Sequence, residues 1–452
     1  MIRKIYLIAI CSILTCSVNA QTQEQFIRSI YDEALVNGES YENLRVLCKK
    51  IGARLSGSVA ADQAVYWGED VMEGIGFDSI WLQEVMVPRW ERGSIEEAIV
   101  DKRPLNITAL GGSIGTPTGG ISGELVEVKT FEELNRLGKE KIAGKIVFFN
   151  RPMEPKHIST FQAYGGCVNQ RATGVVEAAK LGAIAVIVRS MNLKDDDFPH
   201  TGSLRYDADT KRIPGVAVST NDANWLADQL QNGERLSLQL DLNCKQLRDV
   251  KSFNVIGEIK GKQNPEKIIT VGGHLDSWDV GEGAHDDGAG VVHSMEALRI
   301  LKDLGYEPNF TLRVVLFMNE ENGNRGGKKY STEAAEKNEI HVAALESDRG
   351  GFSPRGFSVD GKGINTIQAW LPLLEPYGLH KVEQGFAGVD IGPLKKVQEN
   401  ITLIGLVPDS QRYFDYHHSA DDVFENVNKR ELELGGAALA TLIYLIDSQG
   451  AF

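Results

Sequence analysis

The stretch VGGHLDSWDVGEGAHDDGAG, residues 271–290, places two histidines and five acidic residues in a glycine-rich segment directly after an apolar run. Other groups that can bind a metal follow three later apolar runs. They are Glu320 and Glu321 after TLRVVLFMN, Asp348 after HVAALES, and His417 and His418 after ITLIGLV. Imidazoles and carboxylates together form a ligand set that divalent zinc accepts in proteins. The sequence therefore predicts a zinc site, provided that the fold brings these groups together.

The number of candidate ligands favours two metal ions rather than one. Each group alone has an ordinary explanation, such as a helix cap or a solvated acidic pair. Taken together, five ligands that share one carboxylate suit two ions about 3.5 to 4 Å apart. We expect His274, Asp286 and Asp348 to hold the first zinc, and Asp286, Glu321 and His418 to hold the second, although spacing alone does not separate His418 from His417.

Two further acidic residues have expected roles beside the metals. Adjacent residues on a strand point to opposite sides, so Glu320 and Glu321 should play different parts. One would bind metal, and the other would accept a proton from the attacking water as a general base. Asp276, two residues past His274, is placed to accept the second N–H of that imidazole. These roles describe metal-assisted hydrolysis.

The elements that would position these residues alternate between strand and helix. Runs as continuously apolar as TLRVVLFM and HVAALE predict strands that are buried on both faces, as in a mostly parallel sheet between helix layers. We expect helices over residues 288–304, near 365–377 and over 430–447. In such α/β folds the site lies past the carboxyl ends of the strands, which is where the candidate ligands stand.

The rest of the chain predicts outer helices and a separate small domain. Residues 24–52 and 60–76 have helical apolar spacing. From about residue 95 to 245 the sequence changes to short β-rich pieces and glycine turns, with two helical pieces. We expect a small α/β domain at 95–245, inserted into a catalytic domain made of residues 21–94 and 246–452. It contains no comparable ligand cluster, so we expect it to restrict access to the site or to contact a partner.

Residues 1–20 are typical of a signal peptide. Arg3 and Lys4 precede an apolar run, and Ala20 suits cleavage before Gln21. The run is shorter than the roughly 20 residues that span a bilayer, and no later apolar stretch is long enough to do so. We therefore expect a secreted or periplasmic protein without a membrane span.

Charge and cysteine content exclude several classes of protein. The net charge of -14 disfavours binding to nucleic acid or to anionic membranes. After removal of the signal peptide, the cysteines are Cys48, Cys167 and Cys244. Three cysteines allow at most one disulfide, so the protein does not depend on a disulfide framework.

The motifs closely resemble those of the co-catalytic zinc exopeptidases, and within them the carboxypeptidase Q branch. The likeness rests on GGHLDSWDVGEGAHDDGAG, NEENG, ESDRGGF and YFDYHHSADD. It covers nearly the whole mature chain, because IGARLSGS and VPRWERG resemble the N-terminal part of that branch. The segment AYGGCVNQRATGVVEAAKLGAIAVIVRS resembles its inserted protease-associated domain.

The resemblance implies the zinc exopeptidase fold with this inserted domain, two zinc ions per chain and a homodimer. Carried over residue by residue, it gives the same ligands: His274, bridging Asp286, Glu321, Asp348 and His418, with Glu320 as the base. It favours His418 over His417 because the family's histidine stands four residues before an aspartate, here Asp422. His285 and Val423 depart from the family pattern without being ligands.

We therefore expect a secreted zinc-dependent exopeptidase that hydrolyses dipeptides or short peptides. One alternative is a catalytically inactive, receptor-like binding protein, which should have lost ligands. Another is an acyl-transfer enzyme of the glutaminyl cyclase type, which would use one zinc and lack the inserted domain. The sequence leaves open which end of the peptide is recognised, with Arg349 and Arg412 as candidate cations for a free carboxylate.

Overall fold

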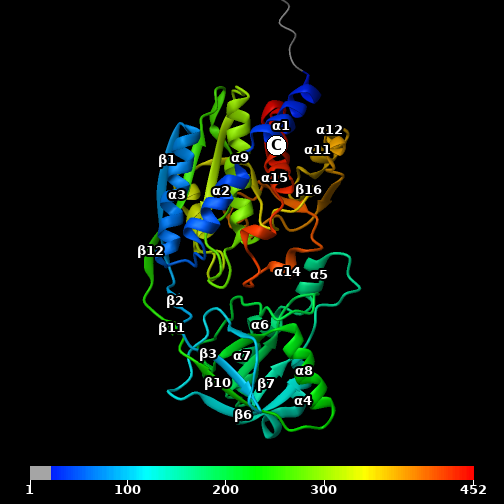
Figure 1. The fold of residues 1–452 in the computed structure, drawn as a ribbon. Helices are drawn as coiled ribbons and strands as arrows, with labels where there is room; N and C mark the ends of the chain where they lie inside the picture. Colours follow the sequence, from blue (N-terminus) through cyan, green and yellow to red (C-terminus); the bar gives the residue numbers. More distant parts are fainter. Residues whose placement is uncertain (1–21) are drawn as a thin grey trace, which may run out of the picture.

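The chain folds into two lobes, each built around an eight-stranded sheet (Figure 1). The computed structural model describes residues 22–452. The predicted signal peptide, residues 1–20, lies outside the described residues. A two-stranded sheet of β2 (Trp90–Glu91) and β11 (Lys245–Gln246) lies where the chain passes between the lobes.

The first lobe contains a mixed sheet with parallel strands at its centre. Its strands, in spatial order, are β1 (Ser79–Val87), β12 (Val250–Ile259), β14 (Phe310–Phe317), β13 (Asn264–His274), β15 (Ile340–Glu346), β18 (Thr402–Pro408), β16 (Pro354–Asp360) and β17 (Lys381–Gln384). The run β14-β13-β15-β18 is parallel, as is the pair β16-β17. The pairs β1-β12, β12-β14 and β18-β16 are antiparallel. The expected mixed, mostly parallel sheet is confirmed.

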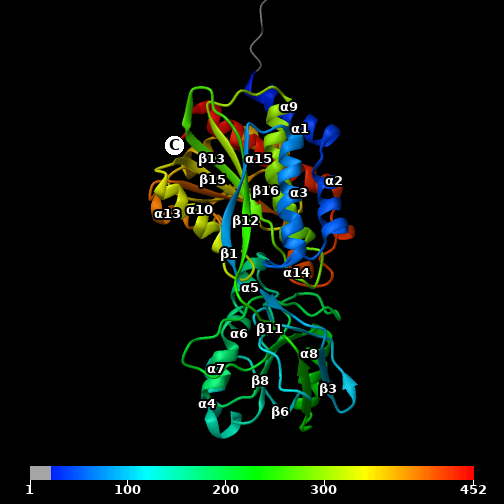
Figure 2. The same ribbon diagram turned by 90° about the vertical axis from the view of Figure 1, so that its left-hand side faces the viewer.

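Helices cover both faces of this sheet (Figure 2). One face packs against α1 (Gln23–Asn37), α2 (Ser40–Val46), α3 (Val59–Ile75), α9 (Ala289–Asp303) and α15 (Lys429–Gln449). The other packs against α10 (Arg325–Glu336) and α13 (Leu394–Val397). Val314 and Val315 on β14 contribute to opposite cores, as strand alternation requires. This is the expected arrangement of a sheet between helix layers.

The second lobe is a smaller α/β unit. Its strands, in spatial order, are β4 (Arg103–Pro104), β3 (Glu96–Val100), β10 (Ser237–Leu242), β6 (Ile121–Val128), β7 (Ile146–Phe149), β8 (Ala185–Arg189), β9 (Gly215–Val218) and β5 (Ile107–Ala109). Its helices are α4 (Phe131–Ile142), α5 (Thr160–Gly165), α6 (Asn169–Ala172), α7 (Gly174–Lys180) and α8 (Thr220–Gln231).

The remaining short elements lie in the first lobe. They are the helices α11 (Ile364–Ala369), α12 (Leu371–Leu374) and α14 (Tyr413–Tyr416), the 3₁₀ turns Glu375–Tyr377 and Phe424–Asn426, and the π-helical turns Leu47–Ile51 and Ala284–Gly288. The single helix expected near residues 365–377 is thus divided into three pieces. Pro372 and Pro376 explain the division, because proline removes a backbone donor and does not suit a helix interior.

The described residues bear on two sequence-based expectations, which concern membrane-spanning helices and disulfides. Across residues 22–452, no helix is both long enough and apolar enough to cross a bilayer. The apolar run ALATLIYLI lies within α15, where it is buried in the core. Cys48, Cys167 and Cys244 are all buried and carry free thiols, so this part of the chain contains no disulfide.

Candidate metal centre

The candidate ligands converge at one edge of the first sheet. His274 is the last residue of β13, Glu320 and Glu321 follow β14, and Asp348 follows β15. His418 lies in the loop after α14. β13, β14 and β15 are parallel neighbours, so their carboxyl ends meet at the same edge.

Asp286 lies at the centre of this group. Its Oδ1 atom is 3.2 Å from Nε2 of His274, which in turn is 3.5 Å from Oδ1 of Asp348. The Oδ2 atom of Asp286 is 3.1 Å from Nε2 of His418, and the same nitrogen is 3.1 Å from Oε2 of Glu321. The structure therefore brings all five predicted ligands together, with each oxygen of Asp286 facing a different histidine.

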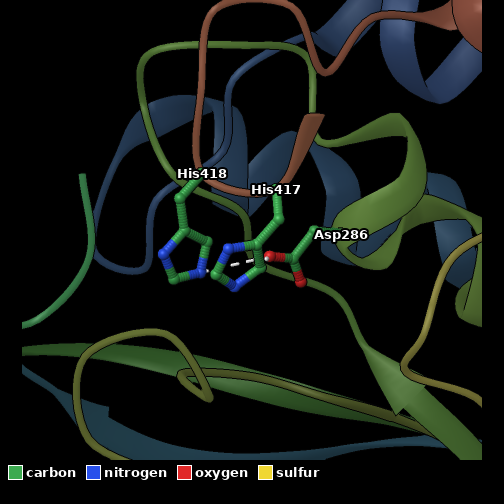
Figure 3. A group of neighbouring side chains, drawn as sticks. All are labelled: Asp286, His417 and His418. Carbon is green, nitrogen blue, oxygen red and sulfur yellow. Dashed lines mark ion pairs between the residues drawn. The ribbon is translucent and has the colours of Figure 1, made fainter. Parts of the chain in front are cut away.

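His417 stands beside His418 and faces the same carboxylate (Figure 3). The two imidazole rings stack, with centroids 3.5 Å apart. The Nε2 atom of His417 is 3.7 Å from Oδ2 of Asp286, compared with 3.1 Å for Nε2 of His418. His418 is closer to Asp286 and also contacts Glu321, so the geometry favours it as the ligand of the pair.

The loop that carries Asp286 is fixed by two other carboxylates. Asp287 accepts hydrogen bonds from the backbone N–H of His274 and of Gly290, each at 3.0 Å, and so ties the end of β13 to the start of α9. Asp422 accepts from the backbone N–H of His285 at 2.7 Å and of Asp286 at 3.1 Å. From the sequence, Asp422 serves only to distinguish His418 from His417 by its spacing, and Asp287 has no predicted role of its own. The sequence feature that could have indicated this anchoring role is that both residues lie within a few positions of a proposed ligand in the chain.

Asp276 makes a different contact from the one predicted. The Nδ1 atom of His274 lies 2.9 Å from the backbone carbonyl oxygen of Asp276 and 3.9 Å from its carboxylate. The carboxylate instead accepts from the backbone N–H of Asn319 at 2.8 Å and of Glu320 at 3.0 Å. The backbone carbonyl of Asp276 therefore faces the imidazole, and its carboxylate holds the turn that carries Glu320.

Glu320 and Glu321 differ for a reason other than strand alternation. β14 ends at Phe317, and both glutamates lie in the turn that follows it. The left-handed backbone of Asn319, with φ of 75°, begins this turn. Both glutamates line the pocket described below, but only Glu321 has a carboxylate oxygen beside Nε2 of His418, at 3.1 Å. The prediction that they differ agrees with the geometry, but the argument from strand pleating does not apply.

The electrostatics of the group suit a cation. Burial alone would lower the pKa of His418, but Glu321 and Asp286 raise it to about 9. Burial raises the pKa of Glu321 to about 7 and that of Glu320 well above its usual range. Among the described residues, Oδ2 of Asp286 and Oε1 of Glu321 are buried and accept no hydrogen bond of normal geometry, although Nε2 of His418 forms an ion pair with Oδ2 of Asp286 at 3.1 Å. Unpaired buried carboxylate oxygens beside imidazoles fit divalent zinc.

A pocket of about 1070 Å³ opens beside the ligands and is lined by both lobes. Every acidic side chain in its lining is a candidate ligand or Glu320. Its cationic lining residues are Arg171, Arg205, Lys328 and Arg349. Arg412, the other candidate from the sequence, does not line the pocket. It pairs with Glu431 at 2.8 Å and lies over the ring of Phe352.

Comparison with known proteins gives consistent matches. The sequence pattern of peptidase family M28 matches residues 254–443. Carboxypeptidase Q of Bos taurus is 35% identical over 422 residues, which cover 92% of this chain and 87% of that protein. The crystal structure of a peptidase M28 precursor from Shewanella amazonensis SB2B superimposes with a TM-score of 0.90 at 32% identity, covering 95% of this chain and 98% of that one. A zinc aminopeptidase from Bacillus subtilis shares the fold, with a TM-score of 0.65 at 20% identity over 90% of this chain and 94% of the other.

Proposed function

Because the chain belongs to peptidase family M28 and is a metallo-exopeptidase, we propose that it hydrolyses dipeptides or short peptides at a centre of two zinc ions. The observation that carries this proposal is the position of Asp286. Its two oxygens face His274 and His418, each within about 3.2 Å, and each histidine has a second carboxylate beside it. One shared carboxylate between two ligand pairs is the arrangement that a binuclear site requires.

His274, Asp286 and Asp348 would hold the first zinc, and Asp286, Glu321 and His418 the second. The similar fold of a zinc aminopeptidase, together with the mixed nitrogen and oxygen donors, supports zinc as the metal. When bound, the ions would polarise the scissile carbonyl and make the attacking water more acidic. Oδ2 of Asp286 and Oε1 of Glu321, which accept no hydrogen bond of normal geometry, are the atoms that binding would satisfy.

Glu320 would act as the general base. Its carboxylate lines the pocket, and no described residue donates a hydrogen bond to it. Asp276 accepts from the Glu320 backbone N–H and so fixes the turn that presents this side chain. Glu320 would take a proton from the attacking water and then deliver it to the leaving amine.

The charges in the pocket favour substrates with a free carboxylate. All four acidic lining residues are proposed ligands or the proposed base, whereas none of the cationic lining residues has either role. Arg349 follows Asp348 directly and donates to the carbonyl of Phe386 at 3.0 Å, and within residues 22–452 its guanidinium has no carboxylate within 4.0 Å. We assign to Arg349 the recognition of the peptide's terminal carboxylate, since arginine pairs with carboxylates in a bidentate manner.

A panel of end-blocked dipeptides tests this function. A free dipeptide and its N-acetylated form should both be hydrolysed, whereas the C-terminal amide should be hydrolysed poorly. Arg349→Gln should raise KM for the free dipeptide by about 10-fold or more, because a charged hydrogen bond is lost. Arg412→Gln is the matched control, since it removes an arginine outside the pocket. Hydrolysis of the amide but not of the N-acetylated peptide would contradict carboxylate recognition.

We further propose that residues 95–245 form an inserted protease-associated domain and that residues 1–20 are removed on export. The boundary near residue 95 is supported by β3, which begins at Glu96 and joins the second sheet. The export proposal rests on the charged and apolar pattern of the first 20 residues. Mass spectrometry of protein recovered outside the cytoplasm should find Gln21 as the first residue. A mature chain that retains Met1 would contradict export through this signal.

A further inference from the structure

A four-residue segment of the second lobe, His200–Ser203, lies against both loops that carry the proposed ligands of the second zinc. His200 donates from Nδ1 to the carbonyl of His417 at 2.7 Å. The backbone N–H of Thr201 donates to the carbonyl of His418 at 2.8 Å. Ser203 donates from Oγ to the carbonyl of Glu321 at 2.8 Å. One short segment thus forms hydrogen bonds with the backbone carbonyls of His417, His418 and Glu321.

Thr201 also contacts the ring of His418. Its carbonyl oxygen is 3.2 Å from Nδ1 of that imidazole. An imidazole that donates from Nδ1 keeps the lone pair of Nε2 free for a metal. Nε2 is the atom that faces Asp286 and Glu321. Nη1 of Arg171, also from the second lobe, donates to the same carbonyl at 3.3 Å and lies 3.4 Å from Nδ1 of His418, so the carbonyl at 3.2 Å is the nearer of the two groups to that nitrogen.

Gly202 shows how tightly this segment fits. Its φ is +129°, and a Cβ added there would lie 2.3 Å from Nη1 of Arg171 and 2.7 Å from Nδ1 of His418. A side chain at this position would therefore press on the ring of a proposed ligand. The close approach of backbone to imidazole depends on glycine.

The proposed first zinc site has no such contact. The Nδ1 atom of His274 is oriented by the carbonyl of Asp276, and its backbone N–H is held by Asp287. Both partners belong to the first lobe. Among the described residues, no hydrogen bond joins His274 or Asp348 to the second lobe. The two halves of the centre therefore differ in which lobe supports them.

We propose that the His200–Ser203 segment positions His418 and Glu321, so that affinity for the second zinc depends on the second lobe while affinity for the first does not. This inference rests on the proposed two-zinc function. It makes the second lobe a structural part of the metal centre, beyond any role in restricting access. Ser203 and Thr201 act as positioning residues, since neither is a ligand.

Zinc affinity of the full chain tests this proposal. The metal-free protein is titrated with zinc against a competing chromophoric chelator, which resolves the two binding steps. Ser203→Ala should weaken one step by about 10-fold, and Gly202→Ala should weaken the same step by up to about 100-fold, the range found when groups that orient metal ligands are lost. Thr160→Val is the matched control. It removes a similar hydroxyl-to-carbonyl bond between the lobes, from Thr160 to Ser410 at 2.7 Å, away from the ligands.

Two backgrounds identify which site is affected. In His274→Ala, the zinc that remains should be at the His418 and Glu321 side, and adding Ser203→Ala should weaken it by about 10-fold. In Glu321→Gln, the remaining zinc should be at the His274 side, and adding Ser203→Ala should leave it unchanged. Equal weakening in both backgrounds, or none in either, would overturn the proposal. If the unaltered protein binds fewer than two zinc ions, the proposed function itself fails first.

Discussion

Glu320 and Glu321 are neighbours in the chain, but their surroundings give them different chemistry. Glu321 has one oxygen 3.1 Å from Nε2 of His418 and the other buried without a donor. Glu320 lines the same pocket as Glu321, but within residues 22–452 its carboxylate forms no hydrogen bond or ion pair with a histidine. The structure thus supports a ligand role for Glu321 and a base role for Glu320.

Substituting each glutamate by glutamine separates these roles. Glu320→Gln should keep close to two zinc ions while kcat falls by roughly 100- to 10,000-fold, because only the proton acceptor is lost. Glu321→Gln should instead lower occupancy of the second zinc, since an amide oxygen is a poorer zinc ligand than a carboxylate. Zinc content and turnover of the two variants are measured side by side. Loss of metal in Glu320→Gln, with metal retained in Glu321→Gln, would show that the assignment is reversed.

At the scale of elements, the loop between β13 and α9 is held by a buried arginine from the N-terminal region. Arg54 is fully buried and donates to the carbonyls of Leu275, Glu282 and Gly283 at 2.6 to 2.9 Å. It is part of the IGARLSGS motif, to which the sequence analysis assigned no role. The motif supports the loop that leads to Asp286.

Loss of Arg54 should therefore destabilise the first lobe. Arg54→Met would leave three carbonyl groups without this donor, and the free energy of unfolding should fall by about 3 kcal/mol or more. Arg28→Met provides the control, because Arg28 forms an exposed pair with Asp32 and its loss should leave stability nearly unchanged. Denaturant unfolding of the two variants gives the comparison. Similar stabilities would show that the loop does not depend on Arg54.

The elements that the sequence predicts well are those with a strong apolar pattern. β13, β14, β15, β18, α9 and α15 lie within a few residues of the expected positions. β1 at the edge of the sheet was not predicted, because its partly exposed SIWLQEVMV lacks a continuous apolar run. The amphipathic α8 and the short β17 were also missed.

The candidate site likewise contains residues that the sequence predicts and contacts that it does not. The five proposed ligands could be selected from the sequence because their side chains follow apolar strands or belong to recognisable motifs. The contacts of His200–Ser203 could not, because they join backbone groups far apart in the sequence. Hydrogen bonds made by backbone atoms leave no pattern of residue types. The contact of Asp276 was assigned to the wrong group of that residue for the same reason.

At the scale of the whole molecule, several histidines are buried in neutral form away from the pocket. His341 lies between Oη of Tyr330 at 2.8 Å and Nε2 of Gln398 at 3.1 Å. Burial, followed by nearby Arg313, lowers the pKa of His341 to about 4, although Glu339 opposes this shift. The unfolded imidazole takes up a proton below about pH 6.5. Its contribution to stability is therefore complete above pH 6.5 and is lost as the pH falls towards 4.

His341→Gln should reduce the acid sensitivity of the fold. Between pH 7.5 and pH 5, the unaltered protein should lose about 2 kcal/mol more stability than the variant, from this one group. Glutamine can still hydrogen-bond with Tyr330 and Gln398. His380→Gln, at an exposed position, is the matched control. Denaturant unfolding at both pH values measures this difference, and parallel pH profiles for all three proteins would contradict the account of His341.

The central claim is that one chain holds two zinc ions around Asp286 and hydrolyses peptides with them. Metal analysis of the dialysed full chain, with dipeptide hydrolysis measured on the same samples, tests it most directly. The account predicts close to two zinc ions per chain, loss of hydrolysis when a chelator removes them, and recovery when zinc is returned. A preparation that is free of metal and still hydrolyses the dipeptide, or one that is fully active with a single zinc per chain, would contradict it.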